Sequence, residues 1–307
     1  MTAMTELSQK ILAEYQIRKT QKQKTAFIEL MQSYFPDMQI QEGGFPKSRN
    51  LIIGDVENAK VLLTAHYDTC AWLPFPNFIT PKAPIIAILY SILVTIPPIL
   101  LSVILVNFLV GLFTNNFWLH YWPSLAASFS LLALMFWGPA NKHTANDNTS
   151  GVITLCELLM TLRDDTRSKV AFIFFDNEEI GLVGSSYFRS KYKQAAQSTP
   201  LINFDCVSDG DYILVAASKT IRAELGAQLD EAFQPTEKKT ILLTNAERVY
   251  YPSDQMGFKK SVAVAALKRK PVIGYYMDRI HTHMDVIFDK SNIKLLCDSV
   301  LRLLKNI

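Results

Sequence analysis

A long segment without charged side chains constrains the fold of this chain more than any other feature of its sequence. Between residues 83 and 141 there is no Asp, Glu, Lys or Arg, a stretch of about 59 residues in a chain of 307. Within it, residues 85–113 are almost wholly apolar and long enough for a helix that crosses a bilayer, and Pro97-Pro98 is predicted to kink that helix. Residues 117–137 form a second apolar run of about 21 residues, which just suffices for another crossing. The segment therefore predicts a hydrophobic helical hairpin, inserted at 83–141, that returns the chain to the side on which it started.

The residues around this hairpin indicate how it would lie in a membrane. Lys82 and Lys142 flank it, whereas the connecting loop, 114–116, carries no positive charge. Because positively charged flanks stay on the cytoplasmic side, this pattern predicts a multi-pass membrane protein whose main domain faces the cytoplasm. Aromatic residues cluster at both ends of the second span, as at bilayer interfaces: Trp118, Tyr121, Trp122 and Trp137. The alternatives are a hydrophobic lid and a hairpin buried in an oligomer, neither of which needs lipid.

The rest of the chain alternates between short apolar runs and amphipathic runs. The strand-like runs are 60–65, 169–175, 201–204, 212–217 and 261–267. The helix-like runs are 150–163, 185–197, 221–233 and 292–304, preceded by two helical stripes before Pro36. Such alternation predicts an α/β fold with a mostly parallel mixed sheet that is covered by helices on both faces. Residues 1–82 and 142–307 would then form one domain, interrupted by the hairpin.

Two adjacent carboxylates, Glu178 and Glu179, follow the predicted strand at 169–175. Open α/β sheets bind ligands beyond the carboxyl ends of their strands. Gly181 and Gly184 favour a turn, which would let the two glutamates serve different purposes. One Glu can bind a metal while its neighbour handles a proton on the metal-bound water. A Glu pair on its own is usually solvated charge, so its meaning depends on the other motifs.

Further motifs place potential metal ligands at the ends of predicted elements. His66 ends a short apolar strand and is followed by Asp68, a pattern typical of a metal ligand held by a carboxylate. Asp147 precedes a helix, where Asp is also a common N-cap, Asp205 follows a short strand, and His281 lies before the last helix. Zinc accepts imidazole nitrogen and carboxylate oxygen, and a bridging carboxylate allows two ions about 3.5–4 Å apart. The set is large enough for two zinc ions.

These motifs resemble those of the co-catalytic zinc aminopeptidases related to bacterial leucyl aminopeptidase, glutamate carboxypeptidase and the glutaminyl cyclases. The resemblance runs from about residue 50 to 290 apart from the hairpin, and it implies a fold of the zinc exopeptidase type. Its specific part is the Glu-Glu pair with the Gly-Leu-x-Gly-Ser tail that follows it. The matching motifs are His66-Tyr67-Asp68, Asn146 to Gly151, Glu178 to Ser185, Asn203-Phe204-Asp205 and His281 to Asp285.

The resemblance implies a metal role for five residues. Asp147 would bridge two zinc ions. Glu179 and His281 would complete one of the two sites. His66 and Asp205 would complete the other. Three carboxylates against two divalent ions leave a net positive site, which favours a hydroxide-like water near neutral pH.

The resemblance also implies two catalytic roles. Glu178 would be the general base that takes a proton from the bridging water and passes it to the leaving amine, and Asp68 would orient His66. The family often has Ser-Asp-His where this chain has Ser253-Asp254-Gln255, whose glutamine can donate a hydrogen bond to an oxyanion but cannot titrate. Asn148, directly after the proposed bridge, is peptidase-like and favours hydrolysis over cyclisation.

The predicted function is a membrane-tethered dizinc exopeptidase, an aminopeptidase that hydrolyses the N-terminal bond of peptide substrates. The alternatives are a one-zinc, glutaminyl cyclase-like aminoacyltransferase and a catalytically silent, receptor-like relative, which would be expected to have lost ligands. The net charge of +3, without a block of like charges, argues against a nucleic-acid partner. The four cysteines are scattered, which favours a reducing compartment. Two of them, Cys70 and Cys206, lie near proposed ligands and are interpreted as core residues or as residues that line the site.

Overall fold

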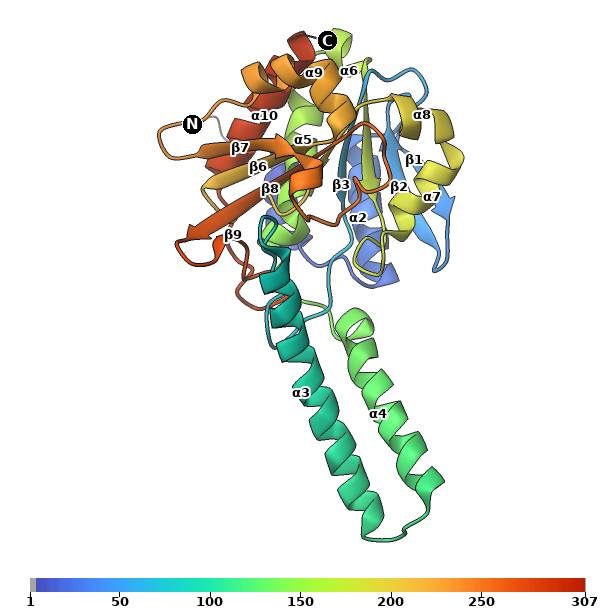
Figure 1. Cartoon of the computed structure of the whole chain (residues 1–307). Coiled ribbons are helices and arrows are strands. Elements are labelled where there is room, and N and C mark those ends of the chain that lie inside the picture. Colours follow the sequence, from blue (N-terminus) through green and yellow to red (C-terminus); the bar gives the residue numbers. More distant parts are fainter. Residues whose placement is uncertain (1–3, 307) are drawn as a thin grey trace.

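The computed structural model of the chain consists of a rounded α/β domain from which a long helical hairpin projects (Figure 1). It describes residues 4–306, so the ends of the predicted domain at residues 1–3 and 307 lie outside the described residues. The hairpin leaves the domain after the third strand and rejoins it before the fifth helix. Segments far apart in the sequence therefore meet at the end of the domain from which the hairpin projects (Figure 1).

The domain is built on one nine-stranded sheet. Along the sheet the strands follow the order β1-β2-β4-β3-β5-β8-β6-β7, and β9 pairs with β8. The strands are β1 Gln39–Gly43, β2 Ser48–Ile53, β3 Val61–His66, β4 Val170–Phe175, β5 Leu201–Phe204, β6 Tyr212–Ala217, β7 Thr240–Asn245, β8 Ser261–Lys270 and β9 Gly274–Tyr276. The central strands β4, β3, β5 and β8 are mutually parallel. The loops that follow β3, β4 and β5 are therefore neighbours at one edge of the sheet.

The predicted α/β class is confirmed, but the sheet is mixed rather than mostly parallel. Four pairs are antiparallel: β1–β2, β2–β4, β6–β8 and β8–β9. The reason lies in short connections, because residues 44–47 between β1 and β2 and residues 271–273 between β8 and β9 leave no room for a helical crossover. Residues 205–211, between β5 and β6, are also too few, and β6 runs antiparallel to β8. β1, β2, β7 and β9 are absent from the predicted strands.

Helices cover both faces of the sheet, as predicted. Alternate side chains of β4 enter different cores, with Phe172 and Phe174 on one face and Ile173 and Phe175 on the other. The first core also contains side chains of α1, α2, α5, α9 and α10, and the second contains side chains of α7 and α8. These helices are α1 Glu6–Glu14, α2 Gln21–Tyr34, α5 Gly151–Thr161, α7 Val183–Lys191, α8 Lys193–Ser198, α9 Lys219–Ala232 and α10 Lys290–Lys305. Shorter turns are η1 Ala145–Ser150, α6 Asp164–Arg167 and η2 Ala246–Arg248.

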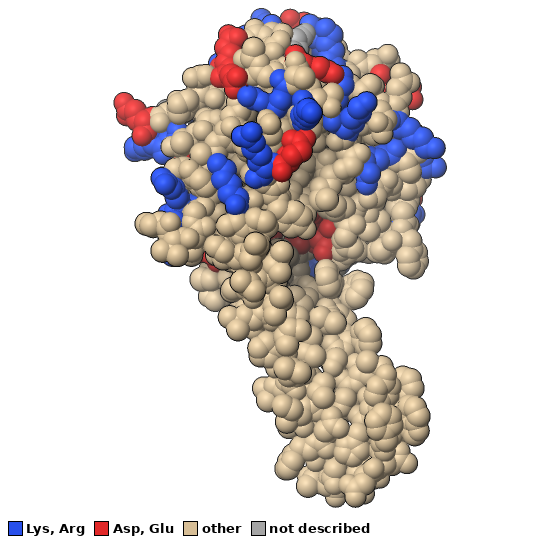
Figure 2. Space-filling model, in the orientation of Figure 1, with Lys and Arg blue, Asp and Glu red and all other residues tan. Residues whose placement is uncertain are grey.

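The hairpin consists of α3, Pro84–Gly111, and α4, Phe117–Trp137, both long and apolar enough to cross a membrane. α3 runs as a single helix across Pro97 and Pro98. Among the described residues of α3 none is buried, and among those of α4 Ser124 alone is. Figure 2 shows that Lys, Arg, Asp and Glu gather on the domain, whereas the hairpin surface carries none. An exposed apolar surface of this extent indicates contact with an apolar partner.

Candidate metal centre

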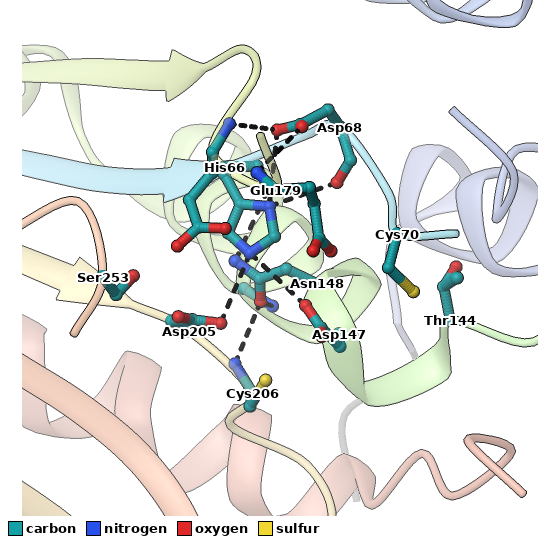
Figure 3. A network of polar contacts seen from close by, with 12 residues as sticks. His66, Asp68, Cys70, Thr144, Asp147, Asn148, Glu179, Asp205, Cys206 and Ser253 are labelled. Atoms are coloured by element: carbon teal, nitrogen blue, oxygen red, sulfur yellow. Dashed lines mark hydrogen bonds and ion pairs between the residues drawn. The ribbon is translucent and has the colours of Figure 1, made fainter. Parts of the chain in front are cut away.

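All six residues predicted as ligands or as the general base lie together near the carboxyl ends of β3, β4 and β5. Figure 3 shows four of them, His66, Asp147, Glu179 and Asp205. They come from five places in the chain: the end of β3 (His66), the loop after β4 (Glu178 and Glu179), the loop after β5 (Asp205), η1 (Asp147) and the loop after β9 (His281). Their ligand-type atoms form three overlapping groups, and within each group the atoms lie within 4.8 Å of one another. The parallel order of β4, β3 and β5 explains the convergence, because it places the ends of these strands side by side.

The carboxylate of Asp147 lies between two clusters of ligand-type atoms. His66 Nε2 is 3.4 Å from Asp147 Oδ1 and 3.4 Å from Asp205 Oδ1. His281 Nε2 is 3.3 Å from Asp147 Oδ2 and 3.4 Å from Glu179 Oε2. The two oxygens of Asp147 therefore face different histidines, one in each cluster.

The spacing of these atoms fits ligands around an ion better than it fits hydrogen bonds. A direct N–H···O hydrogen bond is usually about 2.7–3.2 Å long. Around a tetrahedral zinc ion with bonds of about 2.0–2.1 Å, neighbouring ligand atoms are roughly 3.3 Å apart. In addition, Glu179 Oε1 is buried without a hydrogen-bond partner among the described residues. The residues present therefore fit a metal centre.

A carboxylate on the loop after β9 holds the Asp147 segment in place. Asp285 accepts the backbone N–H of Asn146 at 2.8 Å and that of Asp147 at 3.0 Å. The side-chain amide of Asn148 donates to the carbonyl oxygen of Phe204 at 2.9 Å, which ties η1 to the end of β5. Asp285 belongs to a motif that the sequence singles out, but its role was missed because residue type alone does not show which backbone groups a carboxylate accepts.

The structure places Asp68 against the Glu-Glu turn as well as against His66. Its carboxylate accepts the backbone N–H of Glu178 at 3.0 Å and that of Glu179 at 3.2 Å. His66 Nδ1 lies 3.1 Å from the backbone carbonyl oxygen of Asp68 and 3.6 Å from its carboxylate. Asp68 thus contacts His66 most closely through the backbone, while its carboxylate positions both glutamates.

Several buried carboxylates lie close together at this site. Burial raises the pKa of Glu178 and that of Glu179 well above their usual range, and neighbouring carboxylates raise both further. Burial alone would also raise the pKa of Asp147, but contacts with two histidines lower it below its usual value. Burial opposes protonation of His66, yet the adjacent carboxylates raise the pKa of its imidazole well above the usual value. Among the described salt bridges, none gives Glu179 or Asp205 a Lys or Arg partner. Such an excess of buried negative charge favours a bound cation.

Of the two cysteines near the motifs, Cys70 lines the site. Its sulfur lies in one group with ligand-type atoms of Asp147, Glu179 and His281. Burial raises the pKa of the Cys70 thiol well above its usual range. Cys206 instead joins an apolar cluster, and its backbone N–H donates to a side chain of η1 at 3.2 Å.

The amide of Gln255, at the position that departs from the family, is engaged by protein groups. Its Oε1 accepts from the side chain of Asn203 at 3.1 Å, and its Nε2 donates to the carbonyl oxygen of Tyr251 at 2.6 Å. The adjacent Asp254 is buried, and burial raises its pKa to about 7. These contacts brace the end of β5, next to Asp205.

Two buried cationic side chains of the N-terminal segment contact residues next to the site. Lys24 forms a buried ion pair with Asp176, two residues before the Glu-Glu pair. The guanidinium of Arg18 donates to the carbonyl oxygen of Tyr67 and, at 3.2 Å, to the hydroxyl of Thr149. Neither role could be predicted from the sequence, because Lys and Arg in an amphipathic segment are usually solvated.

The site opens on a cavity of about 210 Å³ at the junction with the hairpin. Glu179 and His281 line one side, and Tyr90 and Val94 of α3 and Met135 of α4 line another. Figure 2 shows acidic atoms in a hollow where the domain meets the hairpin. A ligand would therefore reach the site beside the hairpin.

Comparisons with known proteins identify one matching family and one fold. A sequence model of peptidase family M28 matches residues 130–302. Similar solved structures include a Zn-dependent exopeptidase from Parabacteroides distasonis, with a TM-score of 0.59, 14% identity and coverage of 99% of this chain and 100% of that chain. A glutaminyl cyclase from Porphyromonas gingivalis has a TM-score of 0.57, 14% identity and coverage of 98% and 96%. The LapA aminopeptidase of Legionella pneumophila has a TM-score of 0.53, 12% identity and coverage of 98% and 68%. At these identities the likeness concerns the fold, and no curated protein sequence matches the chain.

Proposed function

The chain belongs to peptidase family M28, and on that premise we propose that it is a membrane-tethered aminopeptidase that uses two zinc ions. The resemblance to zinc aminopeptidases and glutaminyl cyclases is confirmed by the family match and by the similar solved structures. The observation that carries the proposal is the Asp147 carboxylate, whose two oxygens face separate histidines. Two adjacent ions need a carboxylate that is shared in this way.

The ligands are assigned from the two clusters that share Asp147. His66 and Asp205 would hold one ion. Glu179 and His281 would hold the other, with the Cys70 sulfur beside them. Zinc bound at these positions would lower the pKa of a water ligand and polarise the carbonyl of the scissile bond.

Glu178 is the proposed general base. It lies in one group with His66 and Glu179, and Asp68 holds its backbone N–H at 3.0 Å. Burial raises the pKa of Glu178, and cations beside it would lower that pKa again toward the working range of a base. From this position the carboxylate would take a proton from the attacking water and pass it to the leaving amine.

Tethering to a lipid bilayer through residues 83–141 is supported by the hairpin itself. Both helices are long enough to cross, and the described residues of α3 are all at least partly exposed. Lys82 and Lys142 stand at the domain end, whereas loop 114–116 carries no positive charge. By the positive-inside rule, the catalytic domain of this multi-pass protein would face the cytoplasm.

A metal count paired with product analysis tests the enzymatic proposal. The full chain in detergent is analysed for zinc and then incubated with aminoacyl anilides and with a peptide that begins with glutamine. We expect about two zinc ions per chain and release of free amino acids, with loss of activity on chelation and recovery on adding zinc. A single ion together with a cyclised product would identify a cyclase. Zinc-loaded protein without either activity would identify a silent relative.

Two variants locate the ions within the same experiment. Asp147→Asn should lower zinc occupancy at both positions, because it removes the shared ligand. His66→Ala should spare the position at Glu179 and His281. Equal zinc loss in the two variants would contradict the bridging role of Asp147.

A further inference from the structure

An apolar groove lies between α3 and α4 at their domain end. It has a volume of about 300 Å³ and is termed the interhelical groove. Its walls include Trp72 and Leu73 from the loop after β3, Val94 and Ile99 from α3, and Leu132 and Met135 from α4. None of the described residues that line it carries a charge. The interhelical groove is thus an apolar space at the domain end of the segment proposed to lie in lipid.

The interhelical groove adjoins the cavity beside the metal centre. The two spaces share five lining residues, Leu73, Phe75, Val94, Thr95 and Met135. The cavity is also lined by Glu179 and His281. Along α3 the combined walls run from Tyr90 to Ile99, about 14 Å at 1.5 Å per residue. An elongated ligand could therefore lie with one end at the metal centre and the other between the two helices.

The two helices are tied together at the opposite end of the hairpin. Asn107 of α3 donates to the hydroxyl of Ser124 of α4 at 3.0 Å, and His120 Nδ1 lies 3.0 Å from Asn107 Oδ1. Between described residues of α3 and α4, no hydrogen bond lies nearer the domain. The hairpin is therefore closed by polar contacts far from the domain and encloses an apolar space next to it.

A single aliphatic chain suits this space better than other occupants. A helix of another protein, which is about 10 Å across, is too wide for a space of about 300 Å³. A polar ligand would leave hydrogen-bonding groups unpaired, because the lining side chains offer only the Thr95 hydroxyl and the Trp72 indole among the described residues. An aliphatic chain has no such groups and would find apolar walls.

We propose that the interhelical groove binds the aliphatic chain of a membrane-resident peptide or aminoacyl substrate, while the amide bond of that substrate lies at the metal centre. This inference rests on the proposed hydrolysis of an amide at the site. A chain that already lies in the bilayer could enter between α3 and α4 without crossing water. The hairpin would then select the substrate in addition to tethering the enzyme.

The test compares a short and a long hydroxamate, because the head group binds zinc whatever the length of the chain. Full-length, zinc-loaded protein in lipid nanodiscs is titrated by calorimetry with acetohydroxamate and with dodecanohydroxamate. Ile99→Trp fills the interhelical groove, and Leu100→Trp is the matched control, because Leu100 is 55% exposed and lies outside the groove lining. We expect dodecanohydroxamate to bind roughly tenfold or more weakly to Ile99→Trp than to Leu100→Trp, and acetohydroxamate to bind both alike. Both variants share the same lipid, so partition of the chain into the bilayer cancels.

Equal binding of dodecanohydroxamate to the two variants would overturn the inference and leave the metal proposal intact. Failure of both hydroxamates to bind the unmodified protein would count against the metal proposal instead. A second measurement decides the inference in that case: leucine dodecylamide with a diazirine at the chain end is photolysed with metal-free protein. We expect cross-links at Ile99 and Leu132 rather than at Leu100. Cross-links spread over the lipid-facing sides of both helices would overturn the inference.

Discussion

The domain and the hairpin each place side chains in an unfavourable environment, in opposite ways. The domain buries carboxylates, whereas the hairpin exposes apolar side chains. In the domain, Glu179 and Asp205 are carboxylates withdrawn from water without a Lys or Arg partner among the described residues. In the hairpin, apolar side chains such as Leu93, which is 69% exposed, have no protein to cover them. Buried charge is costly until a counter-charge arrives, and exposed apolar surface costs about 25 cal/mol per Å² in water. The contrast is consistent with the two partners proposed above, cations for the domain and lipid for the hairpin.

The two regions meet at the metal centre. Lys19, in the N-terminal segment, donates to the carbonyl oxygen of Phe136 in α4 at 2.6 Å. Trp72, six residues after His66, donates its backbone N–H to Pro139, just after α4, at 2.8 Å. The hairpin is therefore attached beside the proposed ligands, so each region can be altered to test whether the other depends on it.

Removing the hairpin should have the largest effect and would separate the two regions. Replacing residues 84–137 by a short Gly-Ser linker should move the protein from the membrane fraction to the soluble fraction, because the exposed apolar surface is lost. The bonds from Trp72 to Pro139 and from Asn141 to Cys70, at 2.8 and 3.1 Å, lie outside the replaced segment. We therefore expect the zinc content to persist. Centrifugation and elemental analysis measure both results, and a full chain that stays soluble without detergent would contradict the lipid partner.

Glu178→Gln tests the domain alone. The variant keeps the shape of the side chain but cannot take a proton, so turnover of an aminoacyl anilide should fall by about 10²–10⁴ while zinc stays bound. Glu57→Gln, at an exposed glutamate, is the matched control and should leave turnover unchanged. Full activity of a zinc-loaded Glu178→Gln enzyme would show that another group is the base.

Lys24→Ala tests how strongly the N-terminal segment supports the site. The variant leaves the buried carboxylate of Asp176 without its cation, so the free energy of unfolding should fall by about 3–5 kcal/mol. Lys22→Ala, at an exposed lysine of the same helix, should change it little. Denaturant unfolding of the full chain in detergent measures the difference, and equal stability of the two variants would assign Lys24 no structural role.

Asp285→Asn should have the smallest of these effects, because Asp285 acts through the backbone of the proposed bridging segment. Asparagine keeps one acceptor for the N–H groups of Asn146 and Asp147 but loses the negative charge. Zinc affinity should fall by about 10–100-fold, as is typical when a group that orients a ligand is altered. Competition with a chelator measures it. If the zinc affinity of Asp285→Asn is unchanged while Asp147→Asn loses zinc as expected, zinc binding depends on the direct ligands and not on Asp285.

The sequence alone predicted the elements whose signals are local. β3, β4 and β5 were predicted because strands buried on both faces appear as continuous apolar runs. The hairpin was predicted because a charge-free stretch of this length suits few environments in a chain of 307 residues. β1 was missed because it lies at one edge of the sheet and consists mostly of polar residues, so it has no apolar run. β7 was missed because its apolar run, at the opposite edge, contains only Ile241, Leu242 and Leu243.

The candidate site likewise has parts that the sequence predicts and parts that only the tertiary structure shows. Residue type and position at the ends of predicted strands and helices were enough to single out His66, Asp147 and the Glu-Glu pair. Only the tertiary structure decided that Asp147 turns one oxygen to each histidine, that Asp285 holds the backbone beside it, and that the hairpin lines the cavity next to the metal centre. The physical reason is that periodicity and residue chemistry are properties of neighbours along the chain. Contacts between residues far apart in the sequence depend on how strands and helices pack, which local pattern does not specify.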